Sequence, residues 1–119
     1  MMQSVNLVEK LASFSEHWSP RIVSSFNGHD VMVAKLKGEY VWHAHADTDD
    51  LFLVLKGSLR IETEDGTIHL NEGDLHVVPK GVRHCPVADE EAHVLLIETA
   101  GEPNSGDSVE RAPATKIAI

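Results

Sequence analysis

Short hydrophobic runs separated by glycine-containing turns follow one another between residues 21 and 99, a pattern typical of consecutive β-strands. The run at 51–56 is apolar on both faces, so we expect it to be buried within a closed or stacked sheet. The predicted strands are 31–36, 40–45, 51–56, 58–63, 68–70, 75–78 and 94–98. Strands this short and this regularly spaced, with little helix between them, predict an all-β antiparallel barrel or sandwich.

Glycines mark the turns between these strands. Lys37-Gly38-Glu39 is predicted to turn between the first two strands, and Asn71-Glu72-Gly73 between two later ones. Glu64-Asp65-Gly66-Thr67 carries the Asp-Gly pair of a tight hairpin. The turns therefore support the interpretation of the runs as separate short strands.

The two ends of the chain differ from its middle. Residues 1–20 contain a short helical pattern, with Ser4 predicted as its N-cap and Pro20 ending the segment. Residues 101–119 are rich in glycine, proline, serine and aspartate, then finish with the apolar stretch 114–119. This tail is expected either to be loose or to pack its apolar end on a neighbouring subunit.

Length and charge narrow the classes of function. A chain of 119 residues predicts one domain, and 10 basic against 19 acidic residues give a net charge of −9. Such a charge repels phosphate backbones and anionic lipids, so neither nucleic acid nor a membrane surface is an expected partner. The apolar runs are shorter than the ~20 residues of a membrane helix, and no signal peptide is recognisable.

The sequence has a single cysteine, Cys85, which cannot form an internal disulfide. This favours a reducing compartment, and we expect the protein to be cytoplasmic. Cys85 adjoins His84, but neighbouring strand residues face opposite sides, so a nucleophile–base pair is not expected. We interpret Cys85 as a small buried hydrophobic residue.

Histidines supply the first sign of chemistry. His43 and His45 are two residues apart in a strand-like stretch, so both imidazoles face one side. Asp50 follows five residues later, and His84 comes after a Pro-x-Gly turn. Together they form a candidate site for one divalent transition-metal ion such as Fe, Mn, Ni or Zn. The alternative is three half-buried histidines that hydrogen-bond to backbone and water.

Two ordered motifs resemble those of the cupin superfamily. The first comprises Gly38, His43-x-His45, Asp50 and Gly57, and the second Gly73, Pro79-x-Gly81 and His84. The resemblance implies a double-stranded β-helix, or jelly-roll, cupin barrel with a short N-terminal helical segment. It places a motif-bearing core at about 30–99 within a single domain, 1–119.

Three positions depart from the family's pattern. Gly38 is one residue closer to His43 than usual, and Ala88 stands where asparagine is common. More importantly, Asp50 occupies the position of a glutamate, and its side chain is one methylene shorter. Three readings therefore stay open: the strand approaches more closely, the carboxylate binds through water, or only the three histidines ligate.

The resemblance also carries expectations about function. Small cupins include dioxygenases, isomerases and lyases that act on small oxygenated acids or sugars, and they are usually homodimers. The resemblance implies a small-molecule ligand or substrate at the ion. The alternatives are a cupin that binds a metal or small ligand without turnover, and one that the metal only stabilises. Fold alone does not decide between them.

Overall fold

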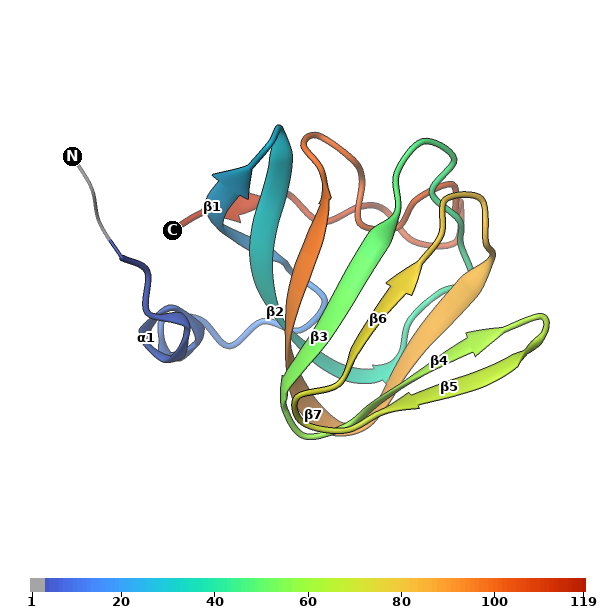
Figure 1. The fold of residues 1–119 in the computed structure, drawn as a ribbon, viewed down its shortest axis with the longest axis horizontal. Coiled ribbons are helices and arrows are strands. Elements are labelled where there is room, and N and C mark those ends of the chain that lie inside the picture. Colours follow the sequence, from blue (N-terminus) through green and yellow to red (C-terminus); the bar gives the residue numbers. More distant parts are fainter. Residues whose placement is uncertain (1–3) are drawn as a thin grey trace.

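The longest strand, β7 (His84–Thr99), is the central strand, with which three others pair. In the computed structural model, which describes residues 4–119, β2 (His29–Glu39) runs antiparallel along one edge of it. On the other edge, β3 (Asp50–Lys56) pairs with the C-terminal half of β7 and β4 (Leu59–Thr63) with its N-terminal half. The strands on either half of β7 curl toward each other and enclose the core between them (Figure 1).

The remaining strands extend these pairings outward. They are β1 (Arg21–Phe26) beside β2, β5 (Gly66–Leu70) beside β4, β6 (Leu75–Val78) beside β3, and β8 (Ile117–Ala118) beside β1. The pairings give the order β5-β4-β7-β2-β1-β8, and no strand pairing within residues 4–119 closes the sheet on itself. The prediction of an all-β fold is confirmed.

The core lies between the curled sheets. Met32, Val54, Ile61 and Val94 are at most 1% exposed, and each comes from a different strand. On β3 the burial alternates, so that Phe52 and Val54 are buried while Leu51, Leu53 and Leu55 are half-buried. The apolar run at 51–56 therefore faces the core with one side and is partly covered on the other.

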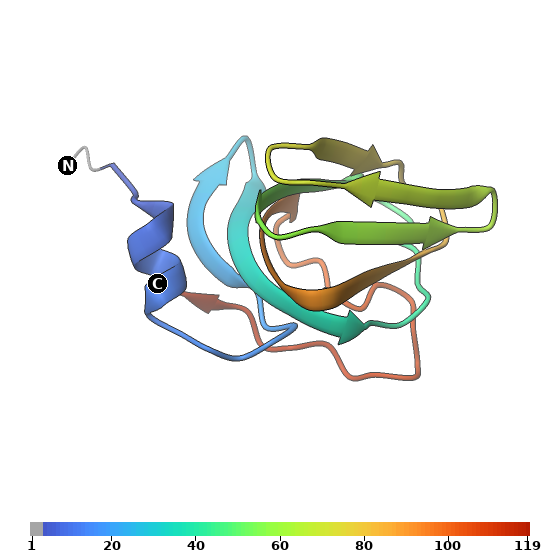
Figure 2. The ribbon, with the colours of Figure 1, turned by 90° about the horizontal axis from the view of Figure 1, so that it is seen from below.

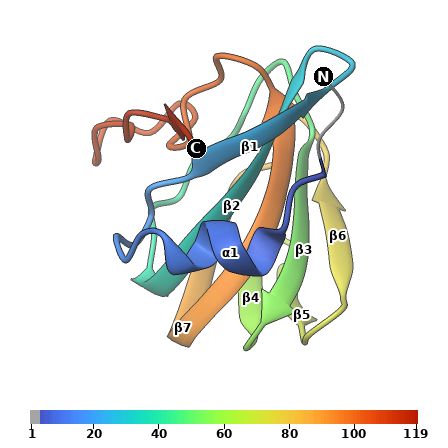
Figure 3. The ribbon, with the colours of Figure 1, turned by 90° about the vertical axis from the view of Figure 1, so that its left-hand side faces the viewer.

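The one helix within residues 4–119 is short: α1 (Leu7–Ala12) lies outside β2 (Figure 3). Its N-cap is Asn6, whose side chain accepts a hydrogen bond of 3.0 Å from the backbone N–H of Glu9. The prediction of Ser4 was wrong because the helix begins two residues later than Ser4 would cap, and the N-cap is the residue directly before the first helical one. Among residues 4–119 there is no helix long and apolar enough to cross a membrane.

Two further predictions about strands were wrong. Residues 40–45 form no strand, and only an isolated bridge joins His43 to His84. Gly38 does not turn the chain but lies within β2, where it has φ +85° beside an irregularity in the pairing with β7. Glycine adopts a positive φ without strain. The irregularity at Gly38 changes the direction of the chain just before the segment that carries His43 and His45.

The C-terminal tail, 101–119, packs on its own chain. It passes beside residues 40–45 and returns to β1, where β8 adds a parallel strand (Figures 1 and 2). The backbone N–H of Ile119 donates to the carbonyl of Ile22 at 2.9 Å. The tail is therefore not loose, whereas contact of its apolar end with a neighbouring subunit stays a prediction. We call residues 101–119 the strap.

Candidate metal centre

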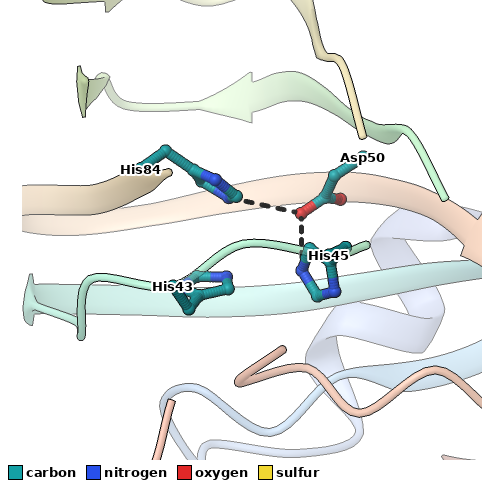
Figure 4. A group of neighbouring side chains, drawn as sticks. All are labelled: His43, His45, Asp50 and His84. Atoms are coloured by element: carbon teal, nitrogen blue, oxygen red, sulfur yellow. Dashed lines mark ion pairs between the residues drawn. The ribbon is translucent and has the colours of Figure 1, made fainter. Parts of the chain in front are cut away.

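The four candidate ligands converge inside the fold (Figure 4). His43 and His45 lie in the segment after β2, Asp50 is the first residue of β3, and His84 is the first residue of β7. One ligand atom from each residue can be chosen so that all four lie within 4.8 Å of one another. Each side chain is buried, with at most 5% of the residue exposed. The structure thus brings together all four residues that the sequence singled out.

Backbone hydrogen bonds hold this geometry. The N–H of His43 donates to the carbonyl of His84, and the N–H of His84 to the carbonyl of His43, both at 2.9 Å. The N–H of Gly81, in the Pro-x-Gly turn, donates to the carbonyl of His45 at 2.8 Å. The turn of the second motif is therefore fastened directly to the histidines of the first.

The second nitrogen of each imidazole is also engaged. Nδ1 of His43 lies 2.8 Å from the carbonyl of Val41, and Nδ1 of His84 lies 2.9 Å from that of Val82. A carbonyl only accepts hydrogen bonds, so each Nδ1 carries the proton. Each neutral imidazole then has its lone pair on Nε2, the nitrogen that ligates when Nδ1 is held in this way.

His45 is held by a carboxylate instead. Its Nδ1 lies 2.9 Å from Oε1 of Glu102, a strap residue. Its Nε2 lies 3.5 Å from Oδ2 of Asp50, and Nε2 of His84 lies 3.7 Å from the same oxygen. Because Asp50 begins β3 inside the cluster, its short side chain reaches the histidines, as the dashed lines in Figure 4 show.

Three atoms of the cluster are buried without a hydrogen-bond partner among the described residues: Nε2 of His45, Nε2 of His84 and Oδ1 of Asp50. A buried polar atom left unpaired costs about 1–3 kcal/mol, so such a concentration calls for an explanation. A tetrahedral ion with bonds of about 2.0–2.1 Å holds its donors about 3.4 Å apart, close to the 3.5 and 3.7 Å between Oδ2 of Asp50 and the Nε2 atoms of His45 and His84. The donor set therefore fits a divalent transition-metal ion.

The histidines of the cluster differ in the pKa values that their surroundings give them. Burial, and then the neighbouring His84, lower the pKa of His43 to about 4. Burial by itself also lowers the pKa of His45, but the Asp50 carboxylate outweighs it and raises that pKa to about 9. Burial opposes ionisation of Asp50, yet His45 and His84 hold the pKa of its carboxyl below its usual range. Without an ion, the charges thus concentrate on His45 and Asp50.

A buried carboxylate that the sequence analysis missed lies next to this cluster. Oε2 of Glu98 is 3.8 Å from Nε2 of His45, and Glu98 is 3% exposed. Burial, and then the charge of Asp50, raise its pKa to about 7, against the opposing charge of Lys116. Glu98 follows Val94 and Leu96 at intervals of two on the inward face of β7, and that periodicity was the available signal.

The space beside the cluster is small. A cavity of about 30 Å³ is lined by apolar side chains and by five polar residues, which are Tyr40, His43, Asp50, Glu98 and Asn104. A water position needs about 10–15 Å³ in this measure, so the cavity has room for about two. In this conformation the site accommodates only very small molecules besides an ion.

Comparison with known proteins decides the family. A family model described as a cupin domain matches residues 31–99, more than half of the chain. The chain belongs to the cupin family. The resemblance inferred from the two histidine motifs is therefore confirmed.

Relatives of this cupin are similar along most of it. The crystal structure of a cupin-2 domain containing protein from Shewanella frigidimarina has 43% sequence identity and a TM-score of 0.78, covering 80% of this chain and 93% of that one. The uncharacterized protein YdbB of Bacillus subtilis is 43% identical over 77 residues, 64% of this chain. The chain spans 62% of that curated relative's length.

A more distant similarity shows the fold alone. The crystal structure of the hydroquinone 1,2-dioxygenase PnpCD, in complex with Cd²⁺ and 4-hydroxybenzonitrile, has 17% sequence identity and a TM-score of 0.67. The match covers 77% of this cupin and 70% of that chain. The scaffold is thus shared with a dioxygenase, and similarity of this kind assigns no reaction.

Proposed function

We propose that this cupin binds one divalent transition-metal ion through His43, His45, His84 and Asp50, and uses it to act on a small oxygenated molecule. The observation that carries the proposal is the group of buried, unpaired donor atoms on His45, His84 and Asp50. Buried polar atoms usually have a hydrogen-bond partner. Here three of them belong to residues that, with His43, offer four ligand atoms within 4.8 Å of one another, so one ion can contact all four residues.

The residues at this site have three roles: to bind the ion, to orient the imidazole rings and to line the cavity. The four candidate ligands hold the ion, and carbonyls and Glu102 fix the three imidazole rings. Tyr40 and Glu98 line the adjoining cavity, so a bound molecule meets a phenol and a second carboxylate beside the cluster. A bound ion supplies Lewis acidity or a place for oxygen activation, which are the chemistries of dioxygenases, isomerases and lyases.

The small cavity favours a second candidate function as well. Room for about two water molecules, with the strap passing beside the candidate ligands, suits a protein that binds or senses a metal without turnover. In that case the protein binds the ion, and no organic substrate binds beside it.

The test is elemental analysis of protein purified without chelators or a histidine tag. About one equivalent of Fe, Mn, Ni or Zn is expected in the wild type and in His69→Ala, whose histidine lies on β5 outside the cluster. His84→Ala should lose it. Iron then leads to oxygen-uptake assays with small acids, and zinc or nickel to isomerase, lyase and hydrolase assays. A wild type that takes up no metal on reconstitution contradicts the proposal.

We also propose that this cupin is a homodimer. In the described part of the chain the edge strand β6 pairs only with β3, and its Leu75 and Val77 are 54% and 38% exposed. Exposed edge strands readily pair with a second chain. Light scattering should give a dimer mass for the wild type and for Val8→Ser on α1, and a lower mass for Leu75→Ser. A monomeric wild type contradicts the proposal.

A further inference from the structure

We infer that the strap supplies a positioning residue to the metal centre: Glu102 orients His45 and thereby sets the affinity for the ion. The inference rests on the proposed metal binding and adds to it a residue outside both histidine motifs. Glu102 lies in the segment whose role the sequence left open.

The backbone shows why His45 needs this partner. His43 and His84 each place Nδ1 against the carbonyl two residues earlier, at Val41 and Val82. The corresponding carbonyl for His45 is that of His43, which already accepts the N–H of His84 at 2.9 Å. His45 differs from the other two histidines, because its Nδ1 partner comes from the strap, where Oε1 of Glu102 lies 2.9 Å away.

The strap is firmly fixed beside the histidines. Oδ1 of Asp107 accepts the N–H of Ala44 at 2.8 Å, and the N–H of Asp107 donates to the carbonyl of Ala44 at 3.1 Å. Gly106 packs so closely on Ala44 and His43 that a Cβ atom there would overlap both. Ala44 stands between the two histidines of the first motif, so these contacts tie the strap to the ligand segment itself.

The far end of the strap is anchored too. Nζ of Lys116 lies 2.9 Å from Oε1 of Glu98 and also donates to the backbone carbonyl of Glu102. The Glu102 side chain is 21% exposed, and its backbone is held by a lysine that is itself paired inside the fold. On its other side, the backbone N–H of Glu102 donates to the carbonyl of Thr99 at 3.2 Å, so contacts before and after Glu102 in the sequence fix its position.

A carboxylate on the outer nitrogen of a ligating histidine fixes the ring and raises the basicity of the nitrogen that binds the metal. Loss of such a partner typically lowers metal affinity by about 10- to 100-fold. A glutamine retains an oxygen that accepts the same N–H, so it should preserve part of the effect.

The experiment is a titration of metal-free full-length protein with Zn²⁺ against a competing chelator dye, with Co²⁺ absorption as a second reading of ligand geometry. We expect Glu102→Ala to bind Zn²⁺ about 10- to 100-fold more weakly and to alter the Co²⁺ spectrum. Glu102→Gln should recover part of the affinity. The matched control is Glu110→Ala, which removes an exposed carboxylate from the same strap and should bind like the wild type.

The outcomes separate the inference from the proposed function. If Glu102→Ala binds within threefold of the wild type while His84→Ala does not bind, the positioning role is overturned and metal binding stands. If Glu102→Gln is as weak as Glu102→Ala, the hydrogen bond to Nδ1 is not the contribution of Glu102, and the inference is again overturned. If the wild type binds neither Zn²⁺ nor Co²⁺, the proposed function fails, and the inference fails with it.

Discussion

Lys116 and Glu98 form a buried ion pair, with 2.9 Å between Nζ and Oε1. Lys116 comes from the strap and Glu98 from the inward face of β7, 3.8 Å from the histidine that Glu102 holds. The pair therefore connects the end of the chain to the wall of the candidate metal centre.

Replacing Lys116 with methionine should destabilise the metal-free protein in a pH-dependent way. The pKa of Glu98 is raised to about 7, so the stability that its protonated form contributes is present at low pH and lost as the pH rises through 7. Lys116 offsets that loss by pairing with the ionised carboxylate. Urea unfolding of Lys116→Met should therefore show a cost about 1 kcal/mol larger at pH 8 than at pH 5, because pH 8 lies about one unit above the pKa of Glu98.

The control for this prediction is Lys37→Met, which removes an exposed lysine and should cost little at either pH. An equal cost of Lys116→Met at pH 5 and pH 8 would mean that the buried pair is not what the lysine maintains.

Gly106→Ala should loosen the strap. A Cβ at this position would overlap the carbonyl of Ala44 and lie 2.9 Å from Cδ2 of His43, and the residue has φ +54°. Gly101→Ala is the matched control, since Gly101 has φ +84° but nothing within 4 Å of its Cβ position. We expect about 1–2 kcal/mol of strain in the control and a clearly larger loss in Gly106→Ala, measured by thermal unfolding. Limited proteolysis should cut Gly106→Ala faster within 101–119. Equal losses in the two variants would contradict the packing described here.

Metal uptake should release a proton. The pKa of His45 is raised to about 9 in the metal-free protein, so this imidazole is protonated at pH 7 and must lose its proton to ligate. Affinity for Zn²⁺ should therefore rise about tenfold per pH unit between pH 6.5 and 8.5. Calorimetric titration in buffers of different ionisation enthalpy measures the released proton directly. A pH-independent affinity over this range is the contrary result.

Cys85 should be unreactive in the folded protein. It is fully buried, and burial, followed by the charges of Glu39 and Glu62, raises the pKa of its thiol to about 11. A disulfide reagent at pH 8 should label the native protein slowly and the protein in guanidinium rapidly, because the thiolate is the reacting form. Rapid labelling of the native state would show that this strand opens far more easily than its burial implies.

The sequence predicted those parts of the fold that have local signals. The hairpin at Glu64–Asp65 and the strands on either side of it were predicted because the Asp-Gly pair and short alternating runs act over a few residues. β7 was predicted only at 94–98, because Pro86 and the acidic run before Ala92 do not look like a strand. Its long partner β2 holds that stretch in place, which is a tertiary effect.

The candidate site divides in the same way. The spacing of the two motifs predicted four candidate ligands, and the structure places them together: His43, His45, Asp50 and His84. Glu102 and Lys116 carry no such signal, because nothing in a polar tail indicates that it returns to the histidines. Their positions follow from the strap's contacts with Ala44 and Glu98.

The central claim is that four buried side chains hold one metal ion, and anomalous diffraction from crystals grown with Zn²⁺ or Fe²⁺ tests it most directly. The account predicts one anomalous peak per chain within bonding distance of His43, His45 and His84, about 2.0–2.1 Å from the imidazole nitrogens, with the Asp50 carboxylate beside it. A cluster without a peak, in crystals whose only anomalous scatterers lie at surface histidines, would contradict it.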